Sequence, residues 1–475
     1  MKKSAHIIFA LLVLTAGCKK FDKDININPN LPTKASNAQL LTYAITQIQY
    51  TIESPFAILF TQQLSEKIYT DASRYTTINF DWDWIYSGPL MNLQTILNTK
   101  NFNINDGSQN NQEAVARILK AYYFWHITDR WGDAPYSEAL KGKDNFTPKY
   151  DAQQDIYNGL QNELKEAAAQ IDNGNPVAGD ILYNGDMDNW RRLANSMRIL
   201  MALRLSKIDP DKGKTEFADA LAAGVFTDNS QNAVYRHIAE TANENYWYNV
   251  FDVLNRQWYC ISEPLVSYMK PWNDPRLPVF ADPATSSGDY VGMPYGVDGN
   301  AAGDIQGSDV SFLGQQIRTQ DASSYVITYA EILFAEAEAA KLGWIPGGDT
   351  DAKMDYDAAI EASVRQWNQD DVSALPAYLA QTGVVYDPAN ALMQIGYQRW
   401  VHLYMNGYEA WAEWRRTGYP VLSPAPDNGG LAIPRREGYP SSEPNINPAN
   451  YKNAIAAQPG FNGKDDLNGR VWWDK

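Results

Sequence analysis

The strongest constraint on the fold is a helical period that recurs in separate stretches of the chain. Between Glu113 and Trp131, apolar side chains fall three or four positions apart, which is the spacing of one face of an α-helix. Gly132 and Pro135 follow, and they predict that this helix ends there, because Gly suits the position after a helix and Pro cannot continue it. The same pattern predicts four further helices, at 151–171 with Asp151 as N-cap, 189–207, 324–342 and 393–416.

Two long segments, 227–321 and 428–475, lack this period and are rich in Gly, Pro, Asn and aromatic residues. Loops of such length are usually functional or form a surface subdomain. Paired helices with long inserts predict a mainly α fold, a tetratricopeptide-like helix-hairpin superhelix packed against a loop-rich ligand-binding subdomain. The sequence shows no clean 34-residue repeat, so this prediction depends on the helix pairs alone.

The N-terminus has the pattern of an exported lipoprotein. Residues 1–17 begin with two lysines, continue with a short apolar run and end in small residues, as a secretory signal peptide does. Cys18 follows Ala16-Gly17 and resembles the acylated cysteine of a bacterial lipobox, although Thr15 stands where Leu is usual. Acyl chains on Cys18 would anchor the protein to a membrane. We predict that residues 18–36 form an extended tether and that 37–475 form the helical domain.

Cysteine content and charge narrow the class of protein. If Cys18 is acylated, Cys260 is the one remaining cysteine, so an apolar core must hold the exported chain together without a disulfide. The formal net charge is −16. A field of this sign disfavours binding to nucleic acid or to an anionic membrane surface.

Several strings, in this order along the chain, resemble the SusD/RagB family, and its SusD-like nutrient-binding branch in particular. Together they cover almost the whole chain after Cys18. They are Asp24–Asn30, Lys120–Phe124, Asp129–Tyr136, Trp190–Arg198, Leu203–Ser206, Asp274–Pro278, Tyr329–Glu338, Gln398–Trp400, Asn406–Trp411, Arg415–Pro420, Ile433–Arg436 and Tyr439–Pro440.

The resemblance implies a lipid-anchored protein of the outer membrane that faces the cell exterior. It also implies a partner, a SusC-like TonB-dependent β-barrel transporter, over which the lipoprotein opens and closes as a lid. The ligand would be a glycan oligosaccharide or a peptide, bound without chemistry and without a cofactor. The sequence does not choose between these two ligand classes, since aromatic, Asn and Asp side chains serve both.

A sugar- or peptide-binding surface needs exposed aromatic rings with polar neighbours. Two stretches have this composition, 75–84 and 245–259. In the first we expect Trp84 in the core and Trp82 exposed, because Asp81 and Asp83 flank it. Burial of the aromatic residues is the equal alternative in both stretches. The candidate ligand-binding residues are Tyr75, Trp82, Asp83, Trp247, Trp258 and Tyr259.

Charged residues in the helices support other interpretations. Glu331, Glu336 and Glu338 could serve acid–base catalysis in a surface glycoside hydrolase, but we expect them to cap helices or to pair with arginines. We also expect Arg198 and Arg204 to form buried ion pairs, and Arg276 to fix a turn. We therefore predict no catalytic residue. A scaffold that binds only protein partners is a third hypothesis.

Two patterns bear on metal binding. The four histidines show no paired spacing, and one lies in the signal peptide, so we predict no transition-metal site. Residues 298–309 partly imitate a calcium loop, but Ala302 replaces an oxygen ligand. We expect a loop without metal there.

Overall fold

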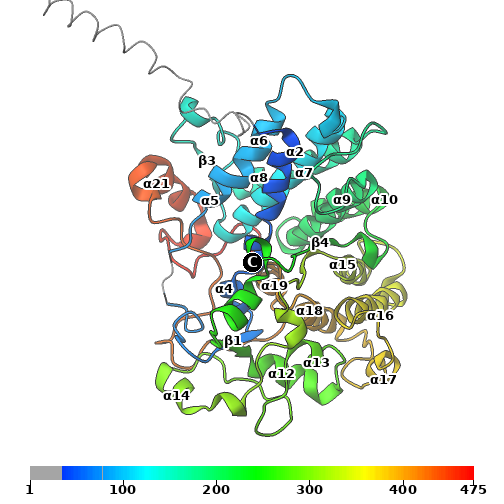
Figure 1. Ribbon diagram of the computed structural model, residues 1–475, viewed down its shortest axis with the longest axis vertical. Helices are drawn as coiled ribbons and strands as arrows, with labels where there is room; N and C mark the ends of the chain where they lie inside the picture. The colour runs from blue at the N-terminus through cyan, green and yellow to red at the C-terminus, as the bar shows by residue number, and fades with distance from the viewer. Residues whose placement is uncertain (1–34, 77–78) are drawn as a thin grey trace, which may run out of the picture.

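The computed structural model describes residues 35–76 and 79–475. The predicted signal peptide, Cys18 and nearly all of the predicted tether lie outside the described residues. The chain is mainly helical, and its strands are short (Figure 1). The helices are α2 (Asn37–Thr46), α3 (Gln49–Ile52), α4 (Pro55–Phe60), α5 (Asp83–Ile85), α6 (Met91–Leu97), α7 (Gln109–Trp131), α8 (Gln153–Gln170), α9 (Met187–Arg204), α10 (Pro210–Ala222), α11 (Tyr246–Tyr248), α12 (Glu263–Met269), α13 (Leu277–Phe280), α14 (Gly299–Asp304), α15 (Tyr329–Lys341), α16 (Gly348–Trp367), α17 (Leu375–Leu379), α18 (Ala391–His402), α19 (Gly407–Thr417), α20 (Glu443–Ile446) and α21 (Pro448–Ala457).

The six strands form three separate antiparallel pairs. Only β2 and β3 pair with the next strand along the chain, and the other two pairs join strands that are far apart in sequence. These pairs connect helices and loops rather than forming a layer of their own. The strands are β1 (Leu64–Glu66) with β5 (Tyr259–Ile261), β2 (Ala134–Pro135) with β3 (Tyr150–Asp151), and β4 (Ala233–Tyr235) with β6 (Ser324–Ile327).

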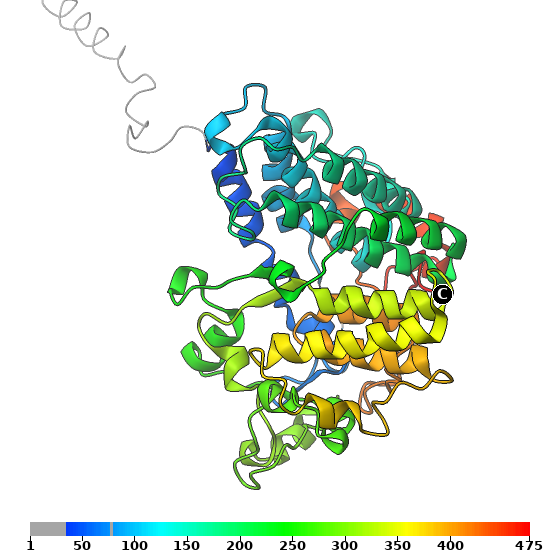
Figure 2. The same ribbon diagram turned by 90° about the vertical axis from the view of Figure 1, so that its right-hand side faces the viewer.

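Long helices that follow one another in the chain pack side by side, and α15 also packs on a later helix. α7 packs on α8, α8 on α9 and α9 on α10, and α15 packs on both α16 and α18. Contacts between α9 and α15 join the two groups, which lie one above the other in Figure 2. This arrangement confirms the predicted mainly α fold of packed helix hairpins.

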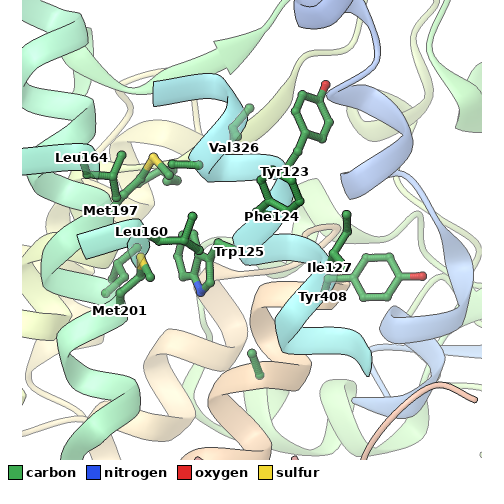
Figure 3. Packing of buried hydrophobic residues seen from close by; sticks show 14 of the residues in the cluster. Tyr123, Phe124, Trp125, Ile127, Leu160, Leu164, Met197, Met201, Val326 and Tyr408 are labelled. Atoms are coloured by element: carbon green, nitrogen blue, oxygen red, sulfur yellow. The ribbon is translucent and has the colours of Figure 1, made fainter. Parts of the chain in front are cut away.

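The largest part of the core surrounds α7. Figure 3 shows Phe124 and Trp125 of α7 in one cluster with side chains from α8 and α9. These side chains are almost completely buried, as the period of the sequence predicts. Within the described residues, no helix combines the length and apolar character needed to cross a membrane.

Three predicted features of the helix boundaries were wrong. Residues 324–327 form β6 and pair with β4, and α15 begins only after Thr328, whose side chain caps it together with Glu331. The predicted helix 393–416 is two helices, α18 and α19, separated at 403–406. Asp151 is not an N-cap; it lies in β3, and its carboxylate accepts hydrogen bonds from Ser137.

The two inserts are also more ordered than the sequence suggests. Residues 227–321 contain β4, β5 and α11 to α14, and 428–475 contain α20 and α21. The chain ends inside the fold, because Trp473 is buried and its Nε1 donates to Asp129 Oδ1 at 2.9 Å. The segment around Trp473 therefore packs in the core and is not part of a surface loop.

Candidate functional site

Trp82, which we expected to be exposed, is buried. Only 2% of its surface is accessible, and its ring packs edge-on against Trp131, with ring centroids 5.4 Å apart. Asp81 and Asp83 beside it are exposed, so the chain turns the two acids outward and the indole inward. Trp84, which we expected in the core, is only half-buried and lies edge-on to exposed Tyr50. The exposure predicted for this stretch was therefore wrong.

Three other candidates also face the interior. Tyr75 is buried, and its hydroxyl accepts a hydrogen bond from the Ala425 amide at 3.2 Å. Trp247 is 1% exposed and packs edge-on against buried Tyr259, with centroids 5.6 Å apart. These rings could stack on a ligand only if the structure opened. In the present conformation they pack inside the protein and do not form a binding surface.

Trp258 is half-buried, and the structure brings it next to a residue that the sequence analysis missed. Tyr69 is 69% exposed, and its ring lies edge-on to Trp258 with centroids 5.1 Å apart. The Arg256 guanidinium lies 4.7 Å from the centroid of the Trp258 ring. Exposed Ile68 is adjacent in sequence to Tyr69. We call Ile68, Tyr69, Arg256 and Trp258 the aromatic surface.

The β1–β5 pair explains how residues about 190 positions apart come together. Glu66 of β1 pairs with Tyr259 of β5, and the Lys67 amide donates to the Trp258 carbonyl at 2.7 Å. This pairing fixes the start of the loop that carries Tyr69 directly beside Trp258. No local pattern in the sequence shows it, because both strands have only three residues.

A buried carboxylate closes the Tyr69 loop. Glu66 Oε2 accepts hydrogen bonds from the amide and the hydroxyl of Ser73, at 2.8 and 2.9 Å. Burial raises the pKa of Glu66 to about 7, against the lowering effect of these bonds. Tyr69 itself has φ of 58°, a left-handed conformation that costs a bulky residue roughly 1–3 kcal/mol. The loop thus holds an exposed aromatic side chain in a strained backbone conformation.

Two further loops border the Tyr69 loop. The Arg74 guanidinium donates to the Asp427 carbonyl at 3.3 Å, and the Asp427 carboxylate accepts from the Asp298 amide at 3.1 Å. These bonds tie together the segment after β1, the start of α14 and the segment after α19, which lie on the lower left in Figure 1. Chemically, the aromatic surface can stack on apolar ring faces and can donate hydrogen bonds from Arg256 and Tyr69.

Buried histidine, serine and glutamate side chains meet elsewhere, without the geometry of a nucleophile relay. Glu53 Oε1 accepts a hydrogen bond from the Ser324 hydroxyl and lies 2.6 Å from His237 Nε2. The other ring nitrogen, Nδ1, lies 3.1 Å from the Asn243 carbonyl. A relay uses the two ring nitrogens separately, one for the acid and one for the nucleophile. Here one nitrogen faces both groups, so the contacts serve packing.

The charged residues of the helices have the structural roles we expected, with one exception. Glu331 caps its own helix through Thr328, and Arg276 binds the Asp274 carboxylate with its Nε and Nη2, at 2.9 and 2.6 Å. Glu336 has neither a cap nor an arginine partner among the described residues; burial, followed by the charge of Asp355, raises its pKa to about 7. The ion pairs of Arg198, Arg204 and Glu338, all buried on at least one side, are Arg198–Asp219, Arg204–Asp129, Arg204–Glu409, Arg204–Glu413, Arg399–Glu338 and Arg416–Glu338.

The segment that imitates a calcium loop begins a helix. Asp298 is the N-cap of α14, where its Oδ1 accepts from the amides of Asn300 and Ala301 at 2.7 and 3.0 Å. In the described part of the chain, no three side chains of His, Cys, Asp or Glu gather as they would around a metal ion.

Comparison with known proteins decides the family. The sequence profile of a SusD-like family, described as starch-binding and associating with the outer membrane, matches residues 29–440. The chain belongs to the SusD-like family. No match was found among the curated proteins.

Solved structures have the same fold as this SusD-like protein. A chitin-binding protein is 29% identical with a TM-score of 0.80, over 92% of this chain and 100% of that one. A Bacteroidetes SusD-like protein is 27% identical with a TM-score of 0.78, over 93% and 100%. A chitin-binding SusD homolog from Flavobacterium johnsoniae, 24% identical over 92% and 98% with a TM-score of 0.79, shares the fold.

Proposed function

We propose that this SusD-like protein is a cell-surface lipoprotein that captures an oligosaccharide and passes it to a SusC-like TonB-dependent β-barrel transporter. The observation that carries the proposal is the aromatic surface, where the exposed Tyr69 ring stands beside Trp258 and Arg256. Sugar rings present C–H faces that stack on such rings, and their hydroxyls accept hydrogen bonds from arginine. The family is described as starch-binding and associated with the outer membrane, which supports the proposed ligand class and location.

We favour a glycan over a peptide as the ligand. The first of the solved structures above, at 29% identity, is of a protein that binds chitin, and the family is described as starch-binding. Both polymers consist of uncharged pyranose rings that can stack on Tyr69 and Trp258. Binding proceeds without bond cleavage in this proposal, and the sugar leaves unchanged.

The anchor and the transporter complete the proposal. Acyl chains on Cys18 hold the protein at the outer membrane, facing the cell exterior, and the tether lets the helical domain move over the mouth of the barrel. Cys260 does not compete for acylation, because Gln257-Trp258-Tyr259 before it does not resemble a lipobox and its side chain is buried. Capture and release then follow the opening and closing of the lid.

The test is direct binding to a glycan and peptide array. We would use the chain from Lys19, which keeps every residue that the structure describes, followed by calorimetry on the best ligand. We expect saturable binding to oligosaccharides, no new reducing ends, and weakening by Tyr69→Ala and Trp258→Ala of about tenfold or more each. Phe146→Ala is the matched control, since Phe146 is 79% exposed and lies in no aromatic pair of the described chain. Binding to peptides alone, turnover of a sugar, or equal affinity of all three variants would overturn the proposal.

A further inference from the structure

Two adjoining cavities lie away from the aromatic surface. The smaller has a volume of about 250 Å³ and includes Trp247 in its wall. The larger is an open groove of about 800 Å³ along β4, β6, α15 and α16. The two share wall residues, and none of the four residues of the aromatic surface lines either. The shared residues are Ser323, Tyr325, Gln366 and Gln369. We call the combined space the amide groove.

Two asparagine side chains of the amide groove are held in fixed orientations by hydrogen bonds. Asn232 accepts from the Tyr329 amide at 2.7 Å and donates to Gln366 Oε1 at 3.3 Å. Asn229 donates to the Ala362 carbonyl at 2.9 Å, while its Oδ1, although buried, has no partner in the part of the chain that the structure describes. Such preset amides lose little freedom when they bind a ligand.

Aromatic rings accompany these amides. Tyr325 lines both cavities, and its ring lies edge-on to buried Trp367 with centroids 5.3 Å apart, which fixes its plane. Tyr329 lines the larger groove and is half-buried. A groove with tyrosine rings and fixed amides has the chemistry that recognises a sugar ring, with its apolar faces and its rim of hydroxyls.

The backbone around the groove is strained. Gln369 and Asp370 follow the end of α16 with φ of 53° and 65°, and Met405 in the smaller cavity has φ of 70°. Helix ends of this kind usually carry Gly, which adopts positive φ without cost. Gln369 and Asp370 therefore place two polar side chains, in succession, in the lining of the groove.

The charges of the groove disfavour an anionic ligand. Its acidic side chains outnumber its two arginines, Arg236 and Arg365, and Arg365 pairs with Glu361 at 2.7 Å. Arg236 is exposed and has no ion pair among the described residues. An uncharged ligand with many hydroxyls therefore fits better than a uronic acid, a sulfated sugar or a phosphate.

We infer that the amide groove is a second carbohydrate-binding site, which takes a short uncharged oligosaccharide. This inference rests on the proposed function for its ligand class, but it assigns a different surface. Two sites on one chain raise the avidity for a polymer that engages both, because the second contact becomes intramolecular. The surface lipoprotein would then hold a long glycan at two points.

Calorimetry with trisaccharides separates the two sites. The probes are N-acetylated chitotriose and maltotriose, two short uncharged oligosaccharides. The groove variant is Gln369→Gly with Arg236→Ala; Gly relieves the positive φ, so this variant keeps its fold. Tyr325→Ala is a second, independent groove variant, and Trp258→Ala reports on the aromatic surface.

We expect two equivalents of one trisaccharide on the unaltered chain. Each groove variant should weaken one equivalent about tenfold or more, and Trp258→Ala should weaken the other. A single equivalent that only Trp258→Ala abolishes overturns this inference and leaves the proposed function standing. No binding of either sugar by the unaltered chain also overturns this inference, whereas the proposed function is decided separately by the glycan and peptide array.

Discussion

Arg416 on α19 and Glu338 on α15 form a buried, two-pronged ion pair. The guanidinium nitrogens Nη1 and Nη2 lie 2.6 Å from Oε1 and Oε2, respectively. Arg416 also donates to Glu413, which in turn contacts Arg204 of α9 and Arg399 of α18. The network thus joins α9, α15, α18 and α19, and it lies where the two groups of helix hairpins meet.

Removing one partner of this pair should be costly. Glu338→Gln leaves the guanidiniums of Arg416 and Arg399 with less compensating charge inside the protein, and we expect a loss of about 3 kcal/mol in the free energy of unfolding. Chemical denaturation followed by circular dichroism measures it. The control is Glu361→Gln, which breaks the exposed pair with Arg365 and should cost under about 1 kcal/mol. Equal losses in the two variants would contradict a core role for Glu338.

The residues near the C-terminus should contribute strongly to the stability of the fold. Trp473 is fully buried, donates to Asp129, and lies against the Arg415 guanidinium at 4.7 Å from the ring centroid. Trp473→Ala should therefore lower the free energy of unfolding by about 3–5 kcal/mol. Deleting exposed Lys475 is the control and should change little. A Trp473→Ala protein as stable as the unaltered chain would show that the tail is dispensable.

The helices could be predicted because their signal is local, whereas the strand β6 depends on a distant partner. α7 follows from its own spacing of apolar residues, and Gly418 ends α19 with φ of 84°, as its position after the two arginines suggests. Residues 324–327 fit a helix locally but pair with β4 about 90 positions earlier. The break before α19 did have a signal, the turn-forming pair Asn406-Gly407.

The site was harder to predict than the fold, for a physical reason. Composition places aromatic residues in a stretch, but exposure depends on which side of the chain meets the core. Trp82 and Trp258 both have polar neighbours, yet only Trp258 reaches the surface. Tyr69 had no signal of its own, since its neighbour Trp258 comes from the strand pairing of β1 and β5.

The proposed acylation of Cys18 can be tested directly. Cys18→Ser should remove the site of lipid attachment, so the exported protein should move from the membrane fraction to the soluble fraction. Mass spectrometry of the unaltered protein should show acyl chains on its first residue, at Cys18. Cys260→Ser is the control and should leave both the mass of the acyl group and the location unchanged, because Cys260 is buried. A Cys18→Ser protein that stays with the membrane would overturn the anchor.

Trp82 and Trp258 should separate stability from binding. Trp82→Phe should lower the free energy of unfolding by about 1–3 kcal/mol, because its ring packs against Trp131 and Tyr439, and should leave sugar affinity unchanged. Trp258→Phe should weaken sugar binding and should change stability little. Denaturation and calorimetry on the same two proteins give both numbers. If Trp82→Phe weakened sugar binding and Trp258→Phe lowered only stability, the ligand would bind at the 75–84 stretch.

Glu66 should make stability depend on pH in a stated direction. Its ordinary pKa of 4.5 applies to the unfolded chain, and burial raises it to about 7 in the folded protein. Between these values the folded chain holds more protons than the unfolded chain, so stability falls as pH rises from about 4.5 to 7 and is level above that. The loss from this group amounts to about 3 kcal/mol.

Glu66→Gln should remove this loss, because a neutral amide has no charge to bury and its oxygen still accepts from Ser73. Other buried carboxyls titrate in the same range, among them Glu336 with a pKa of about 7. The informative quantity is therefore the difference in unfolding free energy between variant and unaltered chain, measured at pH 4.5 and at pH 8. We expect the variant to gain relative stability toward pH 8, while Phe146→Ala shows a constant difference. A Glu66→Gln difference that stays constant would mean that Glu66 is ionised in the fold throughout, and that the Tyr69 loop is closed by a charged carboxylate.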